Sequence, residues 1–212
     1  MAWHAFHPIL GLVAVTCFSL AVARSAPTYK AWNLSNETAP VTLSSCDGKI
    51  GPVPGSSPGL VHTDLINAGI IKLDPYFRYE EENLSWITDQ CWAYTINSGV
   101  SADDVAFNMD LFVRFEGIDT VSTVYFNEQE IGRSANAFRS YSFAIPTHLI
   151  NKDARLNVFR IELASARQYA KTQAAAYPYV VPETQNYNVW AEPSSRNFVR
   201  KAGSDYGWDW GP

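Results

Sequence analysis

The chain has 212 residues, of which 47% are apolar, 14% aromatic and 17% charged, a composition outside the range of disordered or coiled-coil proteins. A chain of this length can bury roughly 70% of the surface that it exposes when unfolded, so a true core is expected. The 16 basic and 21 acidic residues give a net charge of −5, and no basic cluster is longer than Arg200-Lys201. Nucleic acid is therefore excluded as an expected partner, because its binding needs clustered cations.

The first 23 residues have the pattern of a signal peptide. An apolar run from Ile9 to Ala23 is too short to cross a bilayer and ends in Ala21-Val22-Ala23, the small-x-small pattern that signal peptidase accepts. No Lys or Arg precedes the run, so a buried N-terminal helix remains the alternative. Because no later segment has the length of a membrane span, we expect residues 24–212 to form one domain in the secretory pathway, luminal or secreted, without a membrane partner.

Cysteine and asparagine patterns agree with that compartment. Outside the predicted signal peptide the cysteines are Cys46 and Cys91, which could form a disulfide in an oxidising environment or be two unrelated buried thiols. Glycosylation sequons begin at Asn33, Asn36 and Asn83. The first two are so close that both need not carry a glycan.

Alternation of apolar and polar residues is the dominant pattern along the chain. From Val105 to Phe115 every second residue is apolar, which predicts a half-buried strand. Further predicted strands are Tyr29–Leu34, Cys91–Ile96, Val121–Phe126, Tyr141–Ile145 and Leu156–Leu163. Short strands separated by turns favour an all-β antiparallel sandwich over a parallel α/β sheet.

Two helices are expected among the strands. They cover Leu60 to Ala68, ended by Gly69, and Ser165 to Ala176, where Ser165 is the candidate N-cap. From Tyr177 onward the regular pattern fades, and the chain becomes dense in Tyr, Trp, Asn and Pro. That composition is typical of a loop that builds a site.

Several kinds of chemistry have no motif in this sequence. It contains no GxGxxG after a strand, no GxxxxGK[ST] and no GxSxG. Outside the predicted signal peptide the only histidines are His62 and His148, too few for a recognisable zinc site. We therefore expect no cofactor and no metal.

The segment Trp208-Asp209-Trp210 is the candidate for sugar recognition. An indole face can pack on the apolar face of a pyranose, while a carboxylate accepts paired hydrogen bonds from neighbouring hydroxyls. A pair of core tryptophans with a surface aspartate would give the same pattern. Both interpretations remain open on composition alone.

Several short blocks of the sequence occur in the same order as in a known protein family. They are Pro54-Gly55, Pro58–Leu65, Asp74–Tyr76, Trp86-Ile87, Trp92–Tyr94, Phe115–Val121, Phe126–Glu128, Ile131-Gly132, Asn136–Phe143, Asn197–Lys201 and Gly207–Pro212. Together they resemble the N-terminal domain of lysosomal β-mannosidases, in the large glycoside hydrolase family shared with β-galactosidases and β-glucuronidases. The resemblance covers about Trp32 to Pro212.

The resemblance implies a galactose-binding-like jelly-roll β-sandwich with short helices, the first domain of a lysosomal enzyme. Such enzymes remove terminal non-reducing β-D-mannose from oligosaccharides and N-glycan fragments, using one Glu as acid/base and a second as nucleophile. In the family both Glu residues belong to a TIM barrel further along the chain, so no acid here is expected to be catalytic. The implied partners are a β-mannoside oligosaccharide and the downstream domains.

By the same resemblance, Trp208, Asp209 and Trp210 are expected to bind substrate, with Asn197 and Arg200 supporting their loop. Capping or buried structural hydrogen bonds are the expected roles of His62, Asp64 and Asp119, and Glu128 and Glu130 are expected in a solvated turn. We expect the 212-residue chain to lack the last strand of its sandwich and to be inactive alone. The alternatives are a stand-alone secreted carbohydrate-binding sandwich and an adhesion-type sandwich without sugar specificity.

Overall fold

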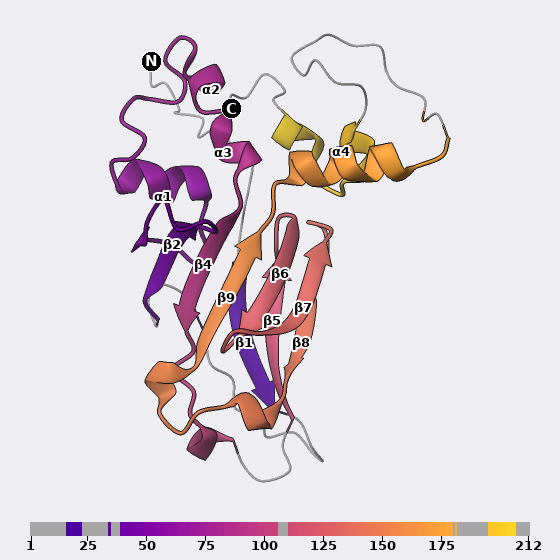
Figure 1. Cartoon of the computed structure of the whole chain (residues 1–212). Coiled ribbons are helices and arrows are strands. Elements are labelled where there is room, and N and C mark those ends of the chain that lie inside the picture. Colours follow the sequence, from indigo (N-terminus) through magenta and orange to yellow (C-terminus); the bar gives the residue numbers. More distant parts are fainter. Residues whose placement is uncertain are drawn as a thin grey trace, which may run out of the picture.

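The computed structural model of the chain describes residues 16–22, 34, 39–105, 110–179, 181 and 195–206 (Figure 1). Its larger sheet contains, in spatial order, β3 (Val53–Pro54), β2 (Val41–Ser45), β4 (Trp92–Asn97), β9 (Val158–Leu163), β6 (Val121–Phe126) and β7 (Gln129–Ala135). Its smaller sheet contains β1 (Thr16–Val22), β5 (Leu111–Gly117) and β8 (Tyr141–Ile145). All strand pairings between these elements are antiparallel. The predicted antiparallel β-sandwich is confirmed.

The core lies between the two sheets and follows the period of two. On β9 the buried residues include Phe159 and Ile161, and the Phe126 ring of β6 lies 4.9 Å from the Phe159 ring. Val113 and Phe115 of β5 are fully buried on the opposing sheet. Each such side chain stabilises the fold by roughly 1.5–3 kcal/mol relative to its exposed state. Alternation of this kind fixes the register, because a slip of one residue would expose the whole apolar set.

The observed strands differ from the predicted ones in several places. β5 begins at Leu111 rather than Val105, since Val105 follows the short helix η1 (Ala102–Asp104), and residues 106–109 lie outside the described part of the chain. Sequence reasoning missed β2, β3 and β7, and of the predicted strand Tyr29–Leu34 only Leu34 lies within the described residues, where it belongs to no strand. β7 is an edge strand with mostly exposed side chains, so it shows no apolar period.

β1 lies within the predicted signal peptide. It pairs with β5 from Thr16↔Gly117 to Val22↔Leu111. Cleavage after residue 23 would remove this strand and turn β5 into an edge strand. Whether the segment is cleaved stays a prediction.

The helices α1 (Val61–Asn67), α2 (Glu80–Asn83), α3 (Trp86–Asp89) and α4 (Ala166–Ala176) gather at one end of the sandwich (Figure 1). Both predicted helices are present, as α1 and α4, and the Ser165 hydroxyl caps α4 by accepting a hydrogen bond from Gln168 N at 3.1 Å. The remaining short helices are η2 (Thr147–Leu149), η3 (Ala154–Leu156), η4 (Ser195–Phe198) and η5 (Gly203–Tyr206). Among the residues described, no helix combines the length and apolarity that a bilayer crossing needs.

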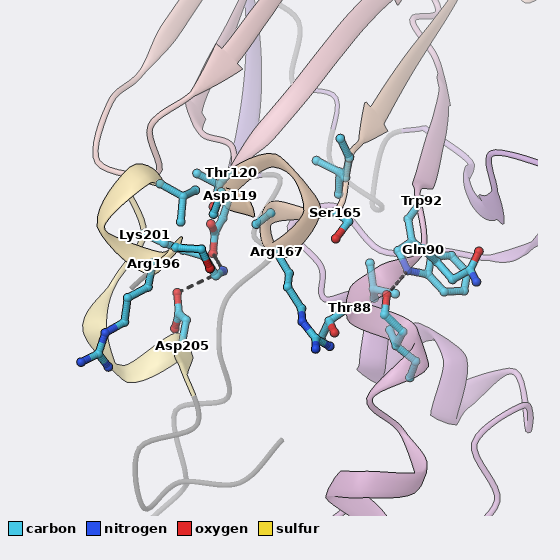
Figure 2. A pocket seen from close by; sticks show the side chains of 18 of the residues that line it. Thr88, Gln90, Trp92, Asp119, Thr120, Ser165, Arg167, Arg196, Lys201 and Asp205 are labelled. Atoms are coloured by element: carbon cyan, nitrogen blue, oxygen red, sulfur yellow. Dashed lines mark hydrogen bonds and ion pairs between the residues drawn. The ribbon is translucent and has the colours of Figure 1, made fainter. Parts of the chain in front are cut away.

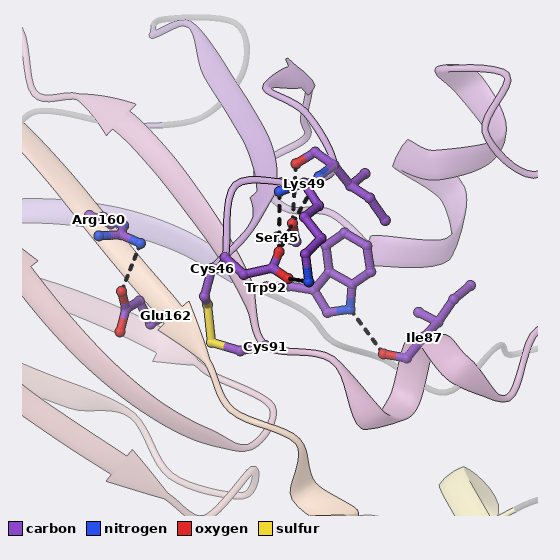
Figure 3. Close-up of a disulfide and its surroundings, with 10 residues drawn as sticks. Ser45, Cys46, Lys49, Ile87, Cys91, Trp92, Arg160 and Glu162 are labelled. Carbon is purple, nitrogen blue, oxygen red and sulfur yellow. Dashed lines mark hydrogen bonds and ion pairs between the residues drawn. A yellow bond between two sulfur atoms is a disulfide. The ribbon is translucent and has the colours of Figure 1, made fainter.

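A disulfide joins Cys46, just after β2, to Cys91, just before β4 (Figure 3). Their Cα atoms are 5.3 Å apart, within the range that such a bond requires. Cys46 N also donates a hydrogen bond to Cys91 O at 2.9 Å. The bridge therefore closes the segment that contains α1, α2 and α3 at the base of two paired strands.

Candidate functional site

A cavity of about 190 Å³ lies at the helical end of the sandwich (Figure 2). Residues of α1, α3 and α4, of the ends of β4 and β9, of the β5–β6 loop and of the segment 195–205 line it. Its apolar lining includes Val61, Ile87, Trp92, Leu163, Ala170 and Val199. The Trp92 indole donates a hydrogen bond to Ile87 O at 2.9 Å, which holds α3 against the start of β4.

An ion cluster forms one wall of the cavity. Lys201 Nζ lies 2.6 Å from Asp119 Oδ2 and 3.2 Å from Asp205 Oδ2, as the dashed lines in Figure 2 show. The three side chains are only 13%, 8% and 7% exposed, respectively. Because one ammonium faces two carboxylates, the cluster carries a net charge of −1 when all three groups are ionised. Each carboxylate contacts Lys201 through its Oδ2 atom.

Two buried oxygen atoms of the same wall are unpaired. Asp119 Oδ1 and Thr120 Oγ1 have no hydrogen-bond partner among the described residues, although these two residues are only 7% and 3% exposed. An unsatisfied buried polar group costs about 1–3 kcal/mol, so these two atoms make this wall less stable than a fully paired one.

Burial controls the titration of this wall. Burial raises the pKa of Asp119 to about 6; the Lys201 charge and hydrogen bond oppose this rise, while the neighbouring Asp205 adds to it. On the facing element α1, burial and then the Lys201 charge lower the pKa of His62. Asp119 thus takes up a proton in mildly acidic solution, whereas His62 stays neutral to lower pH than an exposed histidine.

The raised pKa of Asp119 predicts a pH-dependent stability. Since the folded protein holds this proton more tightly than the unfolded chain, the contribution of Asp119 to stability is largest below pH 4 and is lost as the pH rises through 6. Between pH 4.5 and 7.5 the expected loss is about 2 kcal/mol. We expect Asp119→Asn to remove this loss from denaturant-unfolding curves measured at both values. His62 titrates in both proteins, so its contribution cancels in the stability difference between variant and parent at each pH. An equal stability difference at the two pH values would contradict the raised pKa of Asp119.

Arg200 attaches the segment 195–206 to the loop that follows β7. Arg200 forms a parallel bridge with Asn136, and its carbonyl accepts a hydrogen bond from Ala137 N at 2.9 Å. The Arg200 guanidinium lies 5.8 Å from the centre of the Phe138 ring. Val199 is buried at 7% exposure. Arg200 thus links this segment to residues 136–138, while its support of residues 208–210 stays a prediction.

The substrate-binding prediction cannot be placed on the fold. Trp208, Asp209 and Trp210 lie outside the described residues, as do the sequons at Asn33 and Asn36. Asn83 is exposed at the end of α2 and donates a hydrogen bond to Glu80 Oε1 at 2.9 Å. Its glycosylation stays a prediction.

The other acids named from the sequence have structural surroundings. The buried Asp64 carboxylate accepts hydrogen bonds from Ser56 N and Ser56 Oγ, at 3.0 and 2.6 Å, and from the Tyr94 hydroxyl at 2.9 Å. Glu128 lies in the β6–β7 turn as predicted, whereas Glu130 belongs to strand β7 and forms an exposed ion pair with Arg133 at 2.8 Å. None of these acids lines the cavity.

Sequence reasoning did not find Thr120, Lys201 or Asp205. The spacing of four between Lys201 and Asp205 is visible, but it is common on any helical turn. Asp119 is 82 residues from Lys201, so only the fold brings them together. No local sequence pattern predicts this ion cluster.

Comparison with known proteins gives a consistent result. Residues 32–212 match the family described as glycosyl hydrolase 2 galactose-binding domain-like. The chain is similar to the β-mannosidase of Mus musculus, at 32% identity over 210 residues that cover 95% of this chain and 22% of the relative. It is also similar to β-mannosidase A of Emericella nidulans, at 38% identity over 162 residues, or 76% of this chain and 16% of the relative.

A solved structure agrees with these relatives. The crystal structure of the β-D-mannosidase from Dictyoglomus thermophilum is similar with a TM-score of 0.62 and 25% identity, covering 92% of this chain and 20% of that chain. The predicted galactose-binding-like fold is therefore confirmed. The chain spans about a fifth of the length of the proteins that it matches.

Proposed function

Since the chain belongs to the glycosyl hydrolase 2 galactose-binding domain-like family, we propose that it is the N-terminal part of a β-mannosidase. Such an enzyme hydrolyses terminal non-reducing β-D-mannose residues of oligosaccharides and N-glycan fragments. The similarity to β-mannosidases along 95% of the chain is the observation that carries this proposal. The partners are then a β-mannoside oligosaccharide and further domains of the same enzyme.

In this proposal the chain binds substrate and supplies no catalytic carboxylate. Trp208 and Trp210 pack against the sugar, and Asp209 accepts hydrogen bonds from its hydroxyls. A retaining mechanism needs an acid/base and a nucleophile about 5–5.5 Å apart, which we assign to downstream domains. The described acids support this division, because those lining the cavity both pair with Lys201.

The experiment compares the 212-residue chain with an extended enzyme that includes downstream domains. Given a chromogenic β-mannoside, the chain alone should release no product above the blank, whereas the extended enzyme should turn over. In the extended enzyme, Asp209→Ala should lower kcat/KM by roughly 5- to 150-fold, equivalent to about 1–3 kcal/mol for a hydrogen bond to a charged group.

The matched control is Asp153→Ala, which removes another aspartate whose ion pair with Arg155 is exposed. This variant should keep the parental kcat/KM. Turnover by the short chain would contradict the assigned division of roles. An unchanged kcat/KM in Asp209→Ala would remove Asp209 from the substrate site.

We also propose that the protein enters the secretory pathway and resides in the lysosome or is secreted. The apolar run of residues 9–23 and the sequons at Asn33, Asn36 and Asn83 support this proposal. A mature protein that begins at Arg24 would agree with it. Retention of residues 1–23 would instead favour the pairing of β1 with β5 in the mature fold.

A stand-alone carbohydrate-binding sandwich is the second candidate. The cavity at the helical end of the sandwich favours it, because Asp119 and Thr120 give one wall polar residues to which a sugar could hydrogen-bond. The two candidates differ in the extended open reading frame: continuation into a hydrolase domain favours the enzyme. Binding of methyl β-D-mannoside by a naturally short chain, lost in Thr120→Val, would favour the binding module.

A further inference from the structure

We propose that the side of β5 that pairs with β1 in this chain accepts, in the mature protein, a strand from polypeptide that follows Pro212. β1 then occupies a place that belongs to a downstream strand. This inference rests on the proposed function, which takes residues 1–23 as a cleaved leader and assigns further domains to the same enzyme. It adds the backbone partner of that strand, its direction and its side-chain pattern.

The first observation is the position of β5 within its sheet. β5 is the central strand, with β1 on one side and β8 on the other. Val113 and Phe115 of β5 are fully buried in the core. Loss of β1 would leave the backbone N–H and C=O groups on that side of β5 without strand partners. Such an edge binds an extended segment through main-chain hydrogen bonds, so we expect another strand to cover it.

The second observation is the chemistry of the two faces of β5. Leu111, Val113 and Phe115 are buried, whereas Arg114 and Glu116 form an exposed ion pair at 2.8 Å. Directly opposite residues of paired antiparallel strands share one face of the sheet. The accepted strand should therefore have apolar residues at alternate positions and polar residues between them. β1 has this pattern, since its register places opposite the three buried residues Val22, Leu20 and Phe18.

The third observation is the direction from which downstream polypeptide reaches the sheet. Asp119 follows the last residue of β5, Gly117, by two positions, and its carboxylate contacts Lys201 Nζ at 2.6 Å. Lys201 in turn contacts Asp205 at 3.2 Å. Residues 201–205 thus lie beside the Gly117 end of β5. A segment that enters the sheet from this end runs toward Leu111, antiparallel to β5.

β1 has that same direction. Thr16 stands opposite Gly117 and Val22 opposite Leu111, and the β1 arrow in Figure 1 points away from the end of the sandwich that carries the helices. A downstream strand can therefore take the place of β1 without crossing the sheet. The chain covers 22% of the similar Mus musculus β-mannosidase. In the proposed enzyme most of the polypeptide therefore lies outside this chain, and a tethered segment has a higher effective concentration than a second copy.

Hydrogen exchange in the extended enzyme that begins at Arg24 tests whether β5 is covered. All amides of residues 112–116 should exchange within about tenfold of those of β4, which has β2 and β9 on its two sides. An uncovered β5 would instead show fast exchange at every second residue, by at least about 100-fold, which would overturn the proposal. Protection that is lost on dilution would assign the place to a second copy and would also contradict it.

A cysteine scan identifies the strand that covers β5. In the same enzyme, Arg114→Cys is combined with single cysteines along the first 20 or so residues after Pro212, and oxidised glutathione is added. We expect one position to form a disulfide while its two immediate neighbours, which face the other side of the sheet, do not. The matched control is Arg114→Cys with Ser142→Cys, because Ser142 stands opposite Arg114 on β8. A control that cross-links while every scanned position stays reduced would overturn the proposal.

The 212-residue chain gives the complementary result. In a Cys17→Ser background, Arg114→Cys should cross-link with Ser19→Cys, its partner in the β1–β5 register. Absence of this bridge, in a chain whose Arg114–Ser142 control forms, would contradict the premise that this side of β5 accepts a strand. An extended protein without mannosidase activity would remove the proposed function, whereas the cysteine scan would still decide which segment pairs with β5.

Discussion

Replacement of both Cys46 and Cys91 by serine is expected to lower the free energy of unfolding by about 4 kcal/mol. This value is the loop-closure entropy, in the chain-entropy model, of a bridge that spans 45 residues. β2 and β4 remain paired through hydrogen bonds in the variant, so the fold itself should persist. Guanidinium unfolding of the parent and the variant, with comparison of midpoints and slopes, measures the difference.

The bridge should also affect the cavity. The closed segment contains α1 and α3, which supply Val61 and Ile87 to the apolar wall of the cavity. In the serine variant we expect amide exchange in these helices to rise more than in β9, which lies outside the closed segment. Treatment of the parent with a reductant under unfolding conditions should reproduce the variant, and the variant itself should be insensitive to reductant. A parent whose stability changes by less than about 1 kcal/mol on reduction would show that the disulfide does not stabilise the folded protein.

The parts of the fold that the sequence predicted are those governed by neighbouring residues. Leu111, Val113 and Phe115 alternate because one face of β5 meets the core, and that alternation is visible in the sequence. Ser165 caps α4 through a hydrogen bond to a residue three positions away. Patterns that involve only residues close in sequence depend little on the rest of the chain, so they can be identified from the sequence alone.

The parts that the sequence did not predict depend on long-range contacts or on exposure. β7 pairs with β6 through its backbone while most of its side chains are exposed, so no apolar period marks it. The Lys201–Asp119 pair joins residues 82 positions apart. Family resemblance suggested Trp208-Asp209-Trp210 as the candidate site, but only the fold shows that Lys201 and Asp205 lie against Asp119 of the β5–β6 loop.

A second large effect is expected at Asn157, which is fully buried and uses all its side-chain hydrogen-bonding capacity. Its Nδ2 donates to Val100 O and Asn151 O, both at 2.8 Å. Its Oδ1 accepts from Asn151 N and from Asn127 Nδ2, also at 2.8 Å. One side chain thus ties the β6–β7 turn to the loops that precede η1 and η3.

Substitution Asn157→Leu should therefore destabilise the protein by about 3–5 kcal/mol, because the new side chain fills the space but removes four hydrogen bonds, one buried and three partly buried. Asn151→Ala is the matched control. The Asn151 side chain is exposed and makes only a 3.4 Å contact with Leu156 O, so its removal should cost less than about 1 kcal/mol. Guanidinium unfolding decides between them: a loss in Asn157→Leu no larger than in Asn151→Ala would mean that the backbone groups around residue 157 find partners elsewhere, and that the loops at this end of the sandwich do not depend on the buried amide.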